Sequence, residues 1–258
     1  MEVLTKAMNT SSKKANCILV YGSSGRVGSS IVSEAKSKGM FVIGIGRKHT
    51  SLVDYHVSSD MANIDEVIDR TEEVFMQFEP MSVVFAHRSR ADKSEEDFPN
   101  TVQCLSDSLL PVFALRDVIE KTAQKRDVSV VTVGSTVGKS YSNDTDFSYH
   151  VNKAAVTSAS LMLGYLKSNL RVYSNMVLFG EAKDTRIPED SRYHSSLYNS
   201  ISTTLNKPVS TIQSISRLCV ILAAHAADLQ ISGQELIVDS GLSKMNIESL
   251  FRRAAHNE

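Results

Sequence analysis

The sequence lacks an excess of charge of either sign. Its 258 residues include 28 basic and 29 acidic side chains, which gives a formal net charge of −1. A protein that grips nucleic acid along a groove needs a surplus of Lys and Arg to neutralise the phosphate backbone. The balance of charges therefore argues against nucleic acid as a partner.

Cysteine is also scarce. Cys17, Cys104 and Cys219 are an odd number, and their spacing does not match a metal site. A chain of this length can fill a core with its 42% of hydrophobic residues, and it needs no disulfide bonds to hold that core together. We expect three buried thiols in a reducing compartment.

Long hydrophobic runs, internal repeats and low-complexity linkers are missing. No segment approaches the roughly 20 apolar residues that cross a bilayer, and residues 1–15 show no apolar stretch typical of a signal peptide. We therefore expect a soluble, cytoplasmic protein that makes no membrane contact. Its predicted parts are a flexible N-terminal segment at 1–15, one domain at 16–243 and a tail at 244–258.

The chain does contain a regular alternation of strand and helix patterns. Apolar and β-branched runs predict strands at 17–21, 40–45, 82–85, 128–133, 171–178 and 234–238. Segments with helical periodicity lie between them, at 29–38, 64–78, 109–119, 154–166 and 212–226. This alternation predicts an α/β fold, a Rossmann-like, doubly wound parallel sheet in a three-layer α/β/α domain.

Three glycines join the first strand to the first helix. Glycine in such a turn lets the backbone pass close to a pyrophosphate, while the start of the helix aims N–H groups at it. A tight turn without a ligand also favours glycine, so the flanking strand and helix carry the prediction of a phosphate-binding turn. The residues expected to contact a dinucleotide here are Gly22, Ser24, Gly25, Arg26, Val27 and Gly28.

The end of the second strand bears on the choice of cofactor. An NAD site usually places an acidic side chain about 20 residues beyond the glycines, where it holds the ribose 2′-hydroxyl. This chain has Arg47 and Lys48 there, and no carboxylate before Asp54. Arg47, with Lys48 or Arg26, suits the 2′-phosphate of NADP. We predict NADP (NADPH) as the preferred cofactor and NAD as the alternative, while a solvated pair of basic residues would give the same pattern.

A serine, a tyrosine and a lysine follow the predicted strand at 128–133. Ser135 leaves the end of that strand, and Tyr149 and Lys153 stand four residues apart at the start of a helix. This spacing puts both side chains on one face, so the ammonium can stabilise the phenolate form of the tyrosine. The phenol can then exchange a proton with an alcohol or carbonyl oxygen, to which the Ser135 hydroxyl would hydrogen-bond. A surface tyrosine beside a lysine gives the same spacing by chance. The prediction of a catalytic site therefore rests on the order of the motifs along the chain, which is the glycine turn, then the strand ending in Ser135, then Tyr149 and Lys153.

With the glycine turn and these three residues, the chain resembles the short-chain dehydrogenase/reductase family over nearly all of its length beyond the N-terminal segment. The segment 233–241, with its Asp-Ser-Gly ending, is similar to the closing strand of that family. The resemblance implies that Ser135, Tyr149 and Lys153 are catalytic, and that Tyr149 and Lys153 also contact the cofactor. It further implies cofactor contacts from Asp60 and Met61, with Asp60 at the adenine ring.

The chain departs from the family pattern in three places. The turn after the fourth strand reads Ala86-His87-Arg88-Ser89 where the family has Asn-Asn-Ala-Gly, and we expect Ala86 to contact the cofactor. The fourth catalytic position, an asparagine in the family, falls on Ser108, which can still hold a water molecule. Phe179 replaces the proline of a Pro-Gly turn. These departures indicate a specialised branch.

The leading hypothesis is an NADP(H)-dependent oxidoreductase that moves a hydride between nicotinamide and a carbonyl/alcohol pair. The first alternative is a non-catalytic NAD(P)-binding sensor or scaffold protein. The second is a nucleotide-sugar epimerase or dehydratase, which the short stretch after Gly241 disfavours. The predicted substrate loop at 181–205 is polar, which suits either a polar small-molecule substrate or an ordinary solvated lid. The resemblance also implies a homodimer or homotetramer paired through helices at about 105–122 and 149–168.

Overall fold

The computed structural model describes most of the chain that was predicted to form the domain. The described residues are 16–87, 98–123, 125–139, 147–180, 182, 199, 201–203 and 205–244. The predicted N-terminal segment, most of the substrate loop, the tail beyond 244 and the altered turn from Arg88 onward lie outside these residues.

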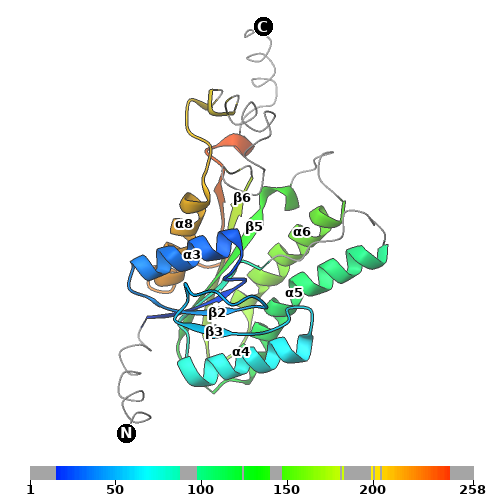
Figure 1. The fold of residues 1–258 in the computed structure, drawn as a ribbon, viewed down its shortest axis with the longest axis vertical. Coiled ribbons are helices and arrows are strands. Elements are labelled where there is room, and N and C mark those ends of the chain that lie inside the picture. Colours follow the sequence, from blue (N-terminus) through cyan, green and yellow to red (C-terminus); the bar gives the residue numbers. More distant parts are fainter. Residues whose placement is uncertain are drawn as a thin grey trace.

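The described residues form a sheet of seven parallel strands in the order β3-β2-β1-β4-β5-β6-β7 (Figure 1). The strands are β1 (Cys17–Tyr21), β2 (Phe41–Ile45), β3 (Tyr55–Val57), β4 (Ser82–Phe85), β5 (Asp127–Ser135), β6 (Arg171–Phe179) and β7 (Glu235–Val238). The predicted doubly wound sheet is confirmed. The strand order reverses between β1 and β4, and such a switch point opens a crevice at the carboxyl ends of the strands.

Helices cover both faces of the sheet (Figure 1). One face carries α3 (Arg26–Ser37) and α8 (Ile212–His225), and the other carries α4 (Ile64–Phe78), α5 (Phe98–Lys121) and α6 (Phe147–Met162). The described residues also include three short 3₁₀ turns, η1 (Thr136–Gly138), η2 (Leu163–Tyr165) and η3 (Leu242–Lys244). Among the described residues, no helix has the length and apolar character that a membrane crossing demands.

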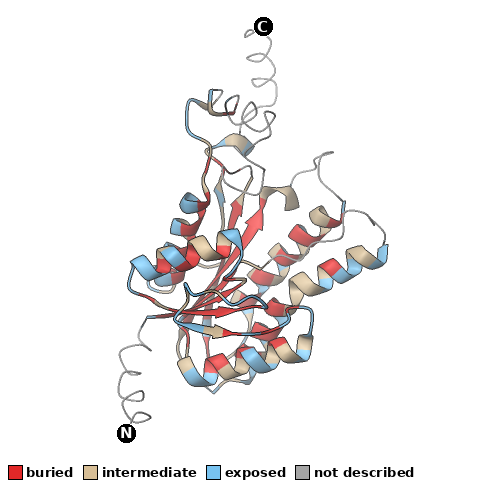
Figure 2. Cartoon of the chain, in the orientation of Figure 1, coloured by how far each residue is buried: buried red, intermediate tan, exposed pale blue. Residues whose placement is uncertain are grey.

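The core lies on both faces of the sheet, and the five central strands are buried almost throughout, whereas the edge strands β3 and β7 are partly exposed (Figure 2). In β1, Leu19 and Tyr21 pack toward α4 and α5, whereas Ile18 and Val20 pack toward α3 and α8. Side chains alternate between the two faces of a strand, so a strand covered on both sides needs apolar residues at every position. The β-branched residues of the strand predicted at 128–133 have this cause, although that strand also buries Ser129 and Thr132.

Local signals fix several ends of the helices. The side chain of Asn63 accepts a hydrogen bond of 3.2 Å from the Glu66 N–H, so Asn63 caps the start of α4. The helix α5 starts at Phe98, well before the predicted 109, and Pro111 lies inside it. Because proline has no N–H, it cannot donate to the carbonyl of Asp107 one turn earlier.

All three cysteines are buried and none forms a disulfide, as predicted. Burial raises the pKa of the Cys17 and Cys219 thiols to about 12. Both thiols are therefore protonated at neutral pH and act as small apolar groups in the core.

Tyr21 provides a test of the packing between β1 and α4. Its hydroxyl lies 2.6 Å from Oγ1 of Thr71, which itself donates to the carbonyl of Val67, so Tyr21 is the donor to Thr71. Replacing Tyr21 by Phe should lower the free energy of unfolding in urea by about 0.5–1.5 kcal/mol, the net value of one buried hydrogen bond. The exposed Tyr55→Phe serves as the control, and equal stability of Tyr21→Phe and wild type would contradict this account.

Candidate active site

The predicted site residues gather at the carboxyl edge of the sheet because all seven strands run in the same direction. Gly22 follows β1, Arg47 lies just beyond β2, Ala86 follows β4 and Ser135 ends β5. The edge therefore brings together segments that are far apart in the sequence.

The glycine turn is packed so tightly that side chains do not fit. Gly22 has a φ of +75°, and a Cβ there would lie 2.9 Å from both Cα and N of His87. A Cβ on Gly28 would lie 2.1 Å from the carbonyl oxygen of Gly22. The turn after β1 thus lies against the turn after β4 and against the first turn of α3, which is the tight turn and close helix–strand packing that glycines allow in a dinucleotide-binding fold.

The start of α3 carries no side-chain cap. Gly25 is the N-cap residue and provides no side-chain hydrogen bond, while Ser24 and Arg26 are exposed and Val27 is half-buried. The first N–H groups of a helix point outward along its axis, and the helix dipole favours an anion there. With the tight glycine contacts, this arrangement fits the pyrophosphate of a dinucleotide.

Two basic side chains lie beyond β2. Arg47 and Lys48 are exposed, and no described carboxylate forms an ion pair with Arg47. Asp54 is the first carboxylate after this strand, but it pairs with Lys36 and accepts a 2.8 Å hydrogen bond from the N–H of Val42. These contacts hold Asp54 near the opposite end of β2, so it cannot take the place of an acidic residue that reads a ribose.

Asp60 and Met61 follow β3. The Asp60 side chain is exposed and accepts a 3.2 Å hydrogen bond from the N–H of Ala62, while Met61 is buried. The adenine contact that the family resemblance implies for this pair stays a prediction.

The short turn η1 brings Ser135 to the start of α6. Ser135 is buried, and its hydroxyl oxygen accepts from the N–H of Val137 at 3.3 Å. The imidazole Nδ1 of His150 donates to the Val137 carbonyl at 2.8 Å. A Cβ on Gly138 would lie 3.1 Å from the backbone N of Ala154, so the helix packs directly on the turn. His150, to which the sequence assigned no role, thus makes a structural contact.

Tyr149 and Lys153 lie one helical turn apart on α6. Lys153 is buried, and its Nζ lies 5.6 Å from the centre of the Tyr149 ring. The structure therefore brings an ammonium, a phenol and the serine hydroxyl of Ser135 to one end of the same helix. Their catalytic roles stay predictions.

Ser108 has a partner that the sequence did not reveal. The side-chain nitrogen of Asn152 donates to Oγ of Ser108 at 2.9 Å and to the carbonyl of Cys104 at 3.0 Å. Asn152 is buried and directly precedes Lys153, so this contact ties the predicted fourth catalytic position on α5 to the helix α6. In the sequence, the one hint of a role for Asn152 was its place directly before Lys153.

His87 is the second residue that sequence reasoning missed, although it lies in the turn marked as unusual. Burial is the main cause that lowers its pKa to about 4. The positive charges of Lys153 and Arg47 act in the same direction, while Asp107 opposes them through its carboxylate and its backbone carbonyl. The His87 ring is therefore neutral at physiological pH. It lies close enough to Arg47 and Lys153 for their positive charges to lower its pKa.

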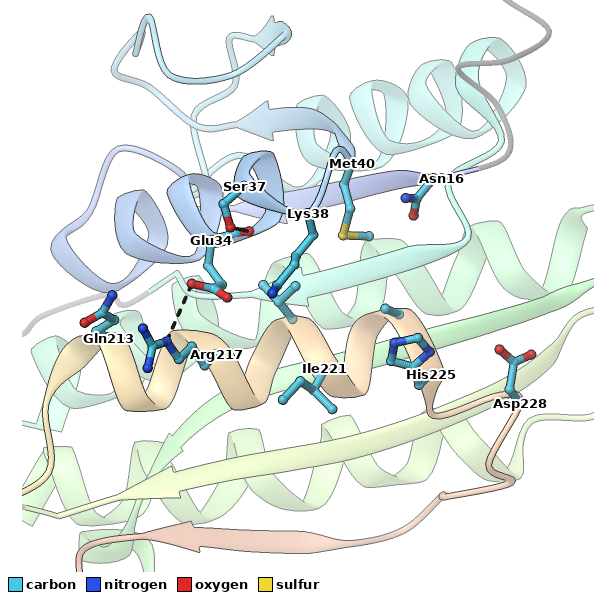
Figure 3. A pocket seen from close by; sticks show the side chains of 12 residues that line it. Asn16, Glu34, Ser37, Lys38, Met40, Gln213, Arg217, Ile221, His225 and Asp228 are labelled. Carbon is cyan, nitrogen blue, oxygen red and sulfur yellow. Dashed lines mark hydrogen bonds and ion pairs between the residues drawn. The ribbon is translucent and has the colours of Figure 1, made fainter.

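A separate hollow of about 800 Å³ lies between α3 and α8 (Figure 3). Glu34 and Arg217 face each other across it at 3.9 Å, and Asn16 and Met40 place one end of it beside the starts of β1 and β2. None of the predicted site residues lines this hollow. It belongs to the opposite edge of the sheet from the glycine turn.

Solved structures share this fold. An aldohexose dehydrogenase from Thermoplasma acidophilum in ligand-free form is 19% identical, with a TM-score of 0.71 over 90% of this chain and 95% of that one. A blue fluorescent protein from a metagenomic library, in complex with NADPH, is 17% identical, with a TM-score of 0.72 over 88% and 98%. A gluconate 5-dehydrogenase from Burkholderia cenocepacia J2315, in complex with NADP and tartrate, is 17% identical, with a TM-score of 0.70 over 90% and 96%.

A family model described as Enoyl-(Acyl carrier protein) reductase matches residues 45–243, which is most of the chain. No curated protein matches the sequence. With the match to the family model and the shared fold, the chain belongs to the short-chain dehydrogenase/reductase family and is an oxidoreductase of that family.

The outer sides of α5 and α6 and the residues next to them expose several large apolar side chains. These are Phe98, Val102, Phe113, Phe147, Met162 and Tyr165. Homodimers or homotetramers paired through these two helices stay a prediction.

The glycine contact can be tested by adding one methyl group. In Gly28→Ala the new Cβ would overlap the Gly22 carbonyl, so α3 must move away from the turn. We expect this overpacking to lower the free energy of unfolding by about 1–3 kcal/mol, measured by urea denaturation. Gly25→Ala is the matched control, since its Cβ would stand 3.3 Å from the same oxygen. A Gly28→Ala protein as stable as Gly25→Ala would show that the turn is not constrained in this way.

Proposed function

We propose that the protein is an NADP(H)-dependent oxidoreductase that transfers a hydride between nicotinamide and a carbonyl/alcohol substrate. The observation that carries the proposal is that a buried serine hydroxyl, a phenol and a buried ammonium lie where the end of β5 packs on α6. The tight glycine turn after β1 lies at the same carboxyl edge of the sheet. Ser135, Tyr149 and Lys153 supply these groups from β5 and α6.

In this proposal the cofactor lies along the carboxyl edge between β1 and β4. The turn from Gly22 to Gly28 and the start of α3 hold the pyrophosphate through backbone N–H groups. Arg47 binds the 2′-phosphate, Asp60 and Met61 lie by the adenine, and Ala86 lines the middle of the site. Lys153 and Tyr149 contact the nicotinamide ribose.

The three catalytic side chains divide the proton chemistry among them. In the direction of reduction, the Tyr149 phenol donates its proton to the substrate oxygen, and the Ser135 hydroxyl hydrogen-bonds the same oxygen. The Lys153 ammonium supplies positive charge that favours the phenolate left behind. When bound, the nicotinamide supplies the hydride.

Ser108 completes the site in the position of the fourth catalytic residue. Its hydroxyl accepts from Asn152, and the hydroxyl hydrogen can still bind a water molecule. A water molecule bound to Ser108 could then pass a proton back to Tyr149 after the phenol has donated its own. Such a water would lie between α5 and the part of α6 that carries Lys153.

The preference for NADP is supported by charge. Arg47 is exposed at the edge and has no carboxylate partner among the described residues, while Asp54 is engaged by Lys36. Planar guanidinium groups bind phosphate through paired, charge-assisted hydrogen bonds. A ribose without a 2′-phosphate would leave Arg47 without this contact.

Tyr149→Phe tests the general acid. We expect turnover of NADPH with a panel of carbonyl compounds to fall by about 10²- to 10⁴-fold, because the proton donor is lost. Cofactor affinity should fall far less than turnover, because the proposed contacts of the glycine turn, Arg47 and Lys153 stay in place. The exposed Tyr165→Phe should behave as wild type. Full activity of Tyr149→Phe would refute the assignment. A wild-type protein that binds NADPH but reduces nothing in the panel would favour the non-catalytic sensor instead.

Arg47→Ala tests whether Arg47 binds the 2′-phosphate of NADPH. By calorimetric titration, we expect affinity for NADPH to fall on the order of tenfold or more, the effect of a lost charge-assisted hydrogen bond, while affinity for NADH stays the same. Lys38→Ala, at the far end of α3, is the control for net charge. Equal weakening of both cofactors, or of neither, would contradict a role at the 2′-phosphate.

A further inference from the structure

His87 is the feature of this edge that the proposed function leaves unexplained. It follows Ala86 at the end of β4, and its Cα and N lie 2.9 Å from the position that a Cβ of Gly22 would take. The residue therefore stands at the switch point of the sheet, directly beside the predicted phosphate turn. What it can bind there depends on the state of its two ring nitrogens.

One nitrogen is already engaged by α5. The backbone carbonyl of Asp107 accepts a hydrogen bond from His87. This carbonyl lacks its helical donor because Pro111 has no N–H. Since Nε2 has no hydrogen-bond partner, the donor is Nδ1. The proton on Nδ1 leaves Nε2 of the neutral ring with only a lone pair, so Nε2 can accept a hydrogen bond but cannot donate one.

The surroundings keep the ring in this neutral form. The groups that affect its charge are Asp107 on α5, Lys153 on α6 and Arg47 beyond β2. Burial and the two positive charges lower the pKa of His87, and together they outweigh Asp107, which raises it. Nε2 is shut off from solvent and has no partner in the described part of the chain. A buried acceptor without a donor is unfavourable, so a ligand that brings a donor to it would gain affinity.

We infer that Nε2 of His87 accepts a hydrogen bond from a ribose hydroxyl of the bound dinucleotide. The inference rests on the proposed function, because it requires a dinucleotide at this edge. The pyrophosphate at neutral pH offers only acceptor oxygens, which cannot satisfy Nε2. The riboses are bonded directly to the pyrophosphate and offer hydroxyl donors, whereas the amino group of adenine and the amide of nicotinamide lie one sugar farther from the turn that His87 contacts. His87 also lies within electrostatic range of Arg47 and Lys153, the two residues proposed to hold the 2′-phosphate and the nicotinamide ribose.

The test is calorimetric titration of NADPH and NADH into wild type, His87→Phe and His87→Gln. Phe keeps a ring of similar size without an acceptor, whereas the amide oxygen of Gln reaches a similar position and can accept. We expect His87→Phe to weaken both cofactors by the same factor, about three- to tenfold, the effect of one neutral hydrogen bond. His87→Gln should recover most of that loss. The exposed His225→Phe on α8 is the matched control and should bind as wild type.

A third ligand, 2′,5′-ADP, locates the hydroxyl. It carries the adenosine ribose and lacks the nicotinamide ribose. A loss of affinity for 2′,5′-ADP in His87→Phe assigns the hydroxyl to the adenosine half. A loss confined to the complete cofactors assigns it to the nicotinamide ribose. Both results support the inference.

Other outcomes overturn it. Unchanged binding by His87→Phe excludes the hydrogen bond, and equal losses in His87→Phe and His87→Gln mean that ring shape matters rather than the acceptor. A loss for NADPH alone would point to the 2′-phosphate instead. If His87→Phe does not fold, as judged by its thermal unfolding, His87→Leu replaces it. If wild type binds neither cofactor, the proposed function itself is refuted. This outcome differs from unchanged binding in the variants, which refutes only the role of His87.

Discussion

The parallel pairing of the strands is the constraint on which the rest of the structure depends. Each strand pairs with its neighbours in parallel, from β3 at one edge to β7 at the other, so every strand ends at the same side of the sheet. Parallel strands need crossover helices, and these bury both faces of the sheet. The apolar sequence of strands such as β1 and β2 follows from that burial, and the shared carboxyl edge is its functional consequence.

Backbone contacts, more than side-chain contacts, set the distances at this edge. Gly22 and Gly28 allow three chain segments to meet without intervening side chains, and Gly138 does the same for η1 and α6. Ser135 and Lys153 therefore come from packed, rigid elements rather than from free loops. Rigid support of this kind matters because catalytic groups must be held within a small tolerance of their working geometry.

Much of the fold could be predicted from the sequence, because the patterns that indicate strands, turns and helices are local. The strand-turn-helix pattern around Gly22 and the β-branched residues of β5 each depend on neighbours in the chain, and the structure confirms these elements. The edge strand β3 was missed because Tyr-His-Val is short and carries no apolar run. The early start of α5 was missed because Pro111 lies two residues after the predicted start at 109, and proline is favoured in the first turn of a helix rather than in its interior.

The contacts that no local pattern encodes were beyond sequence reasoning. Asn152 on α6 donates a hydrogen bond to Ser108 on the neighbouring helix α5, and the two residues are 44 positions apart in the chain. His87 finds the Asp107 carbonyl only because β4 ends beside the Pro111 turn of α5. Both depend on how distant elements pack, and both modify the site at the positions where this chain departs from its family.

A crystal structure of the protein grown with NADPH tests the central claim most directly. The account predicts density for the cofactor along the carboxyl edge, with the pyrophosphate over the start of α3 and the nicotinamide beside Tyr149. Cofactor bound elsewhere, for example in the hollow between α3 and α8, would contradict the account. An empty edge at saturating NADPH would contradict it equally.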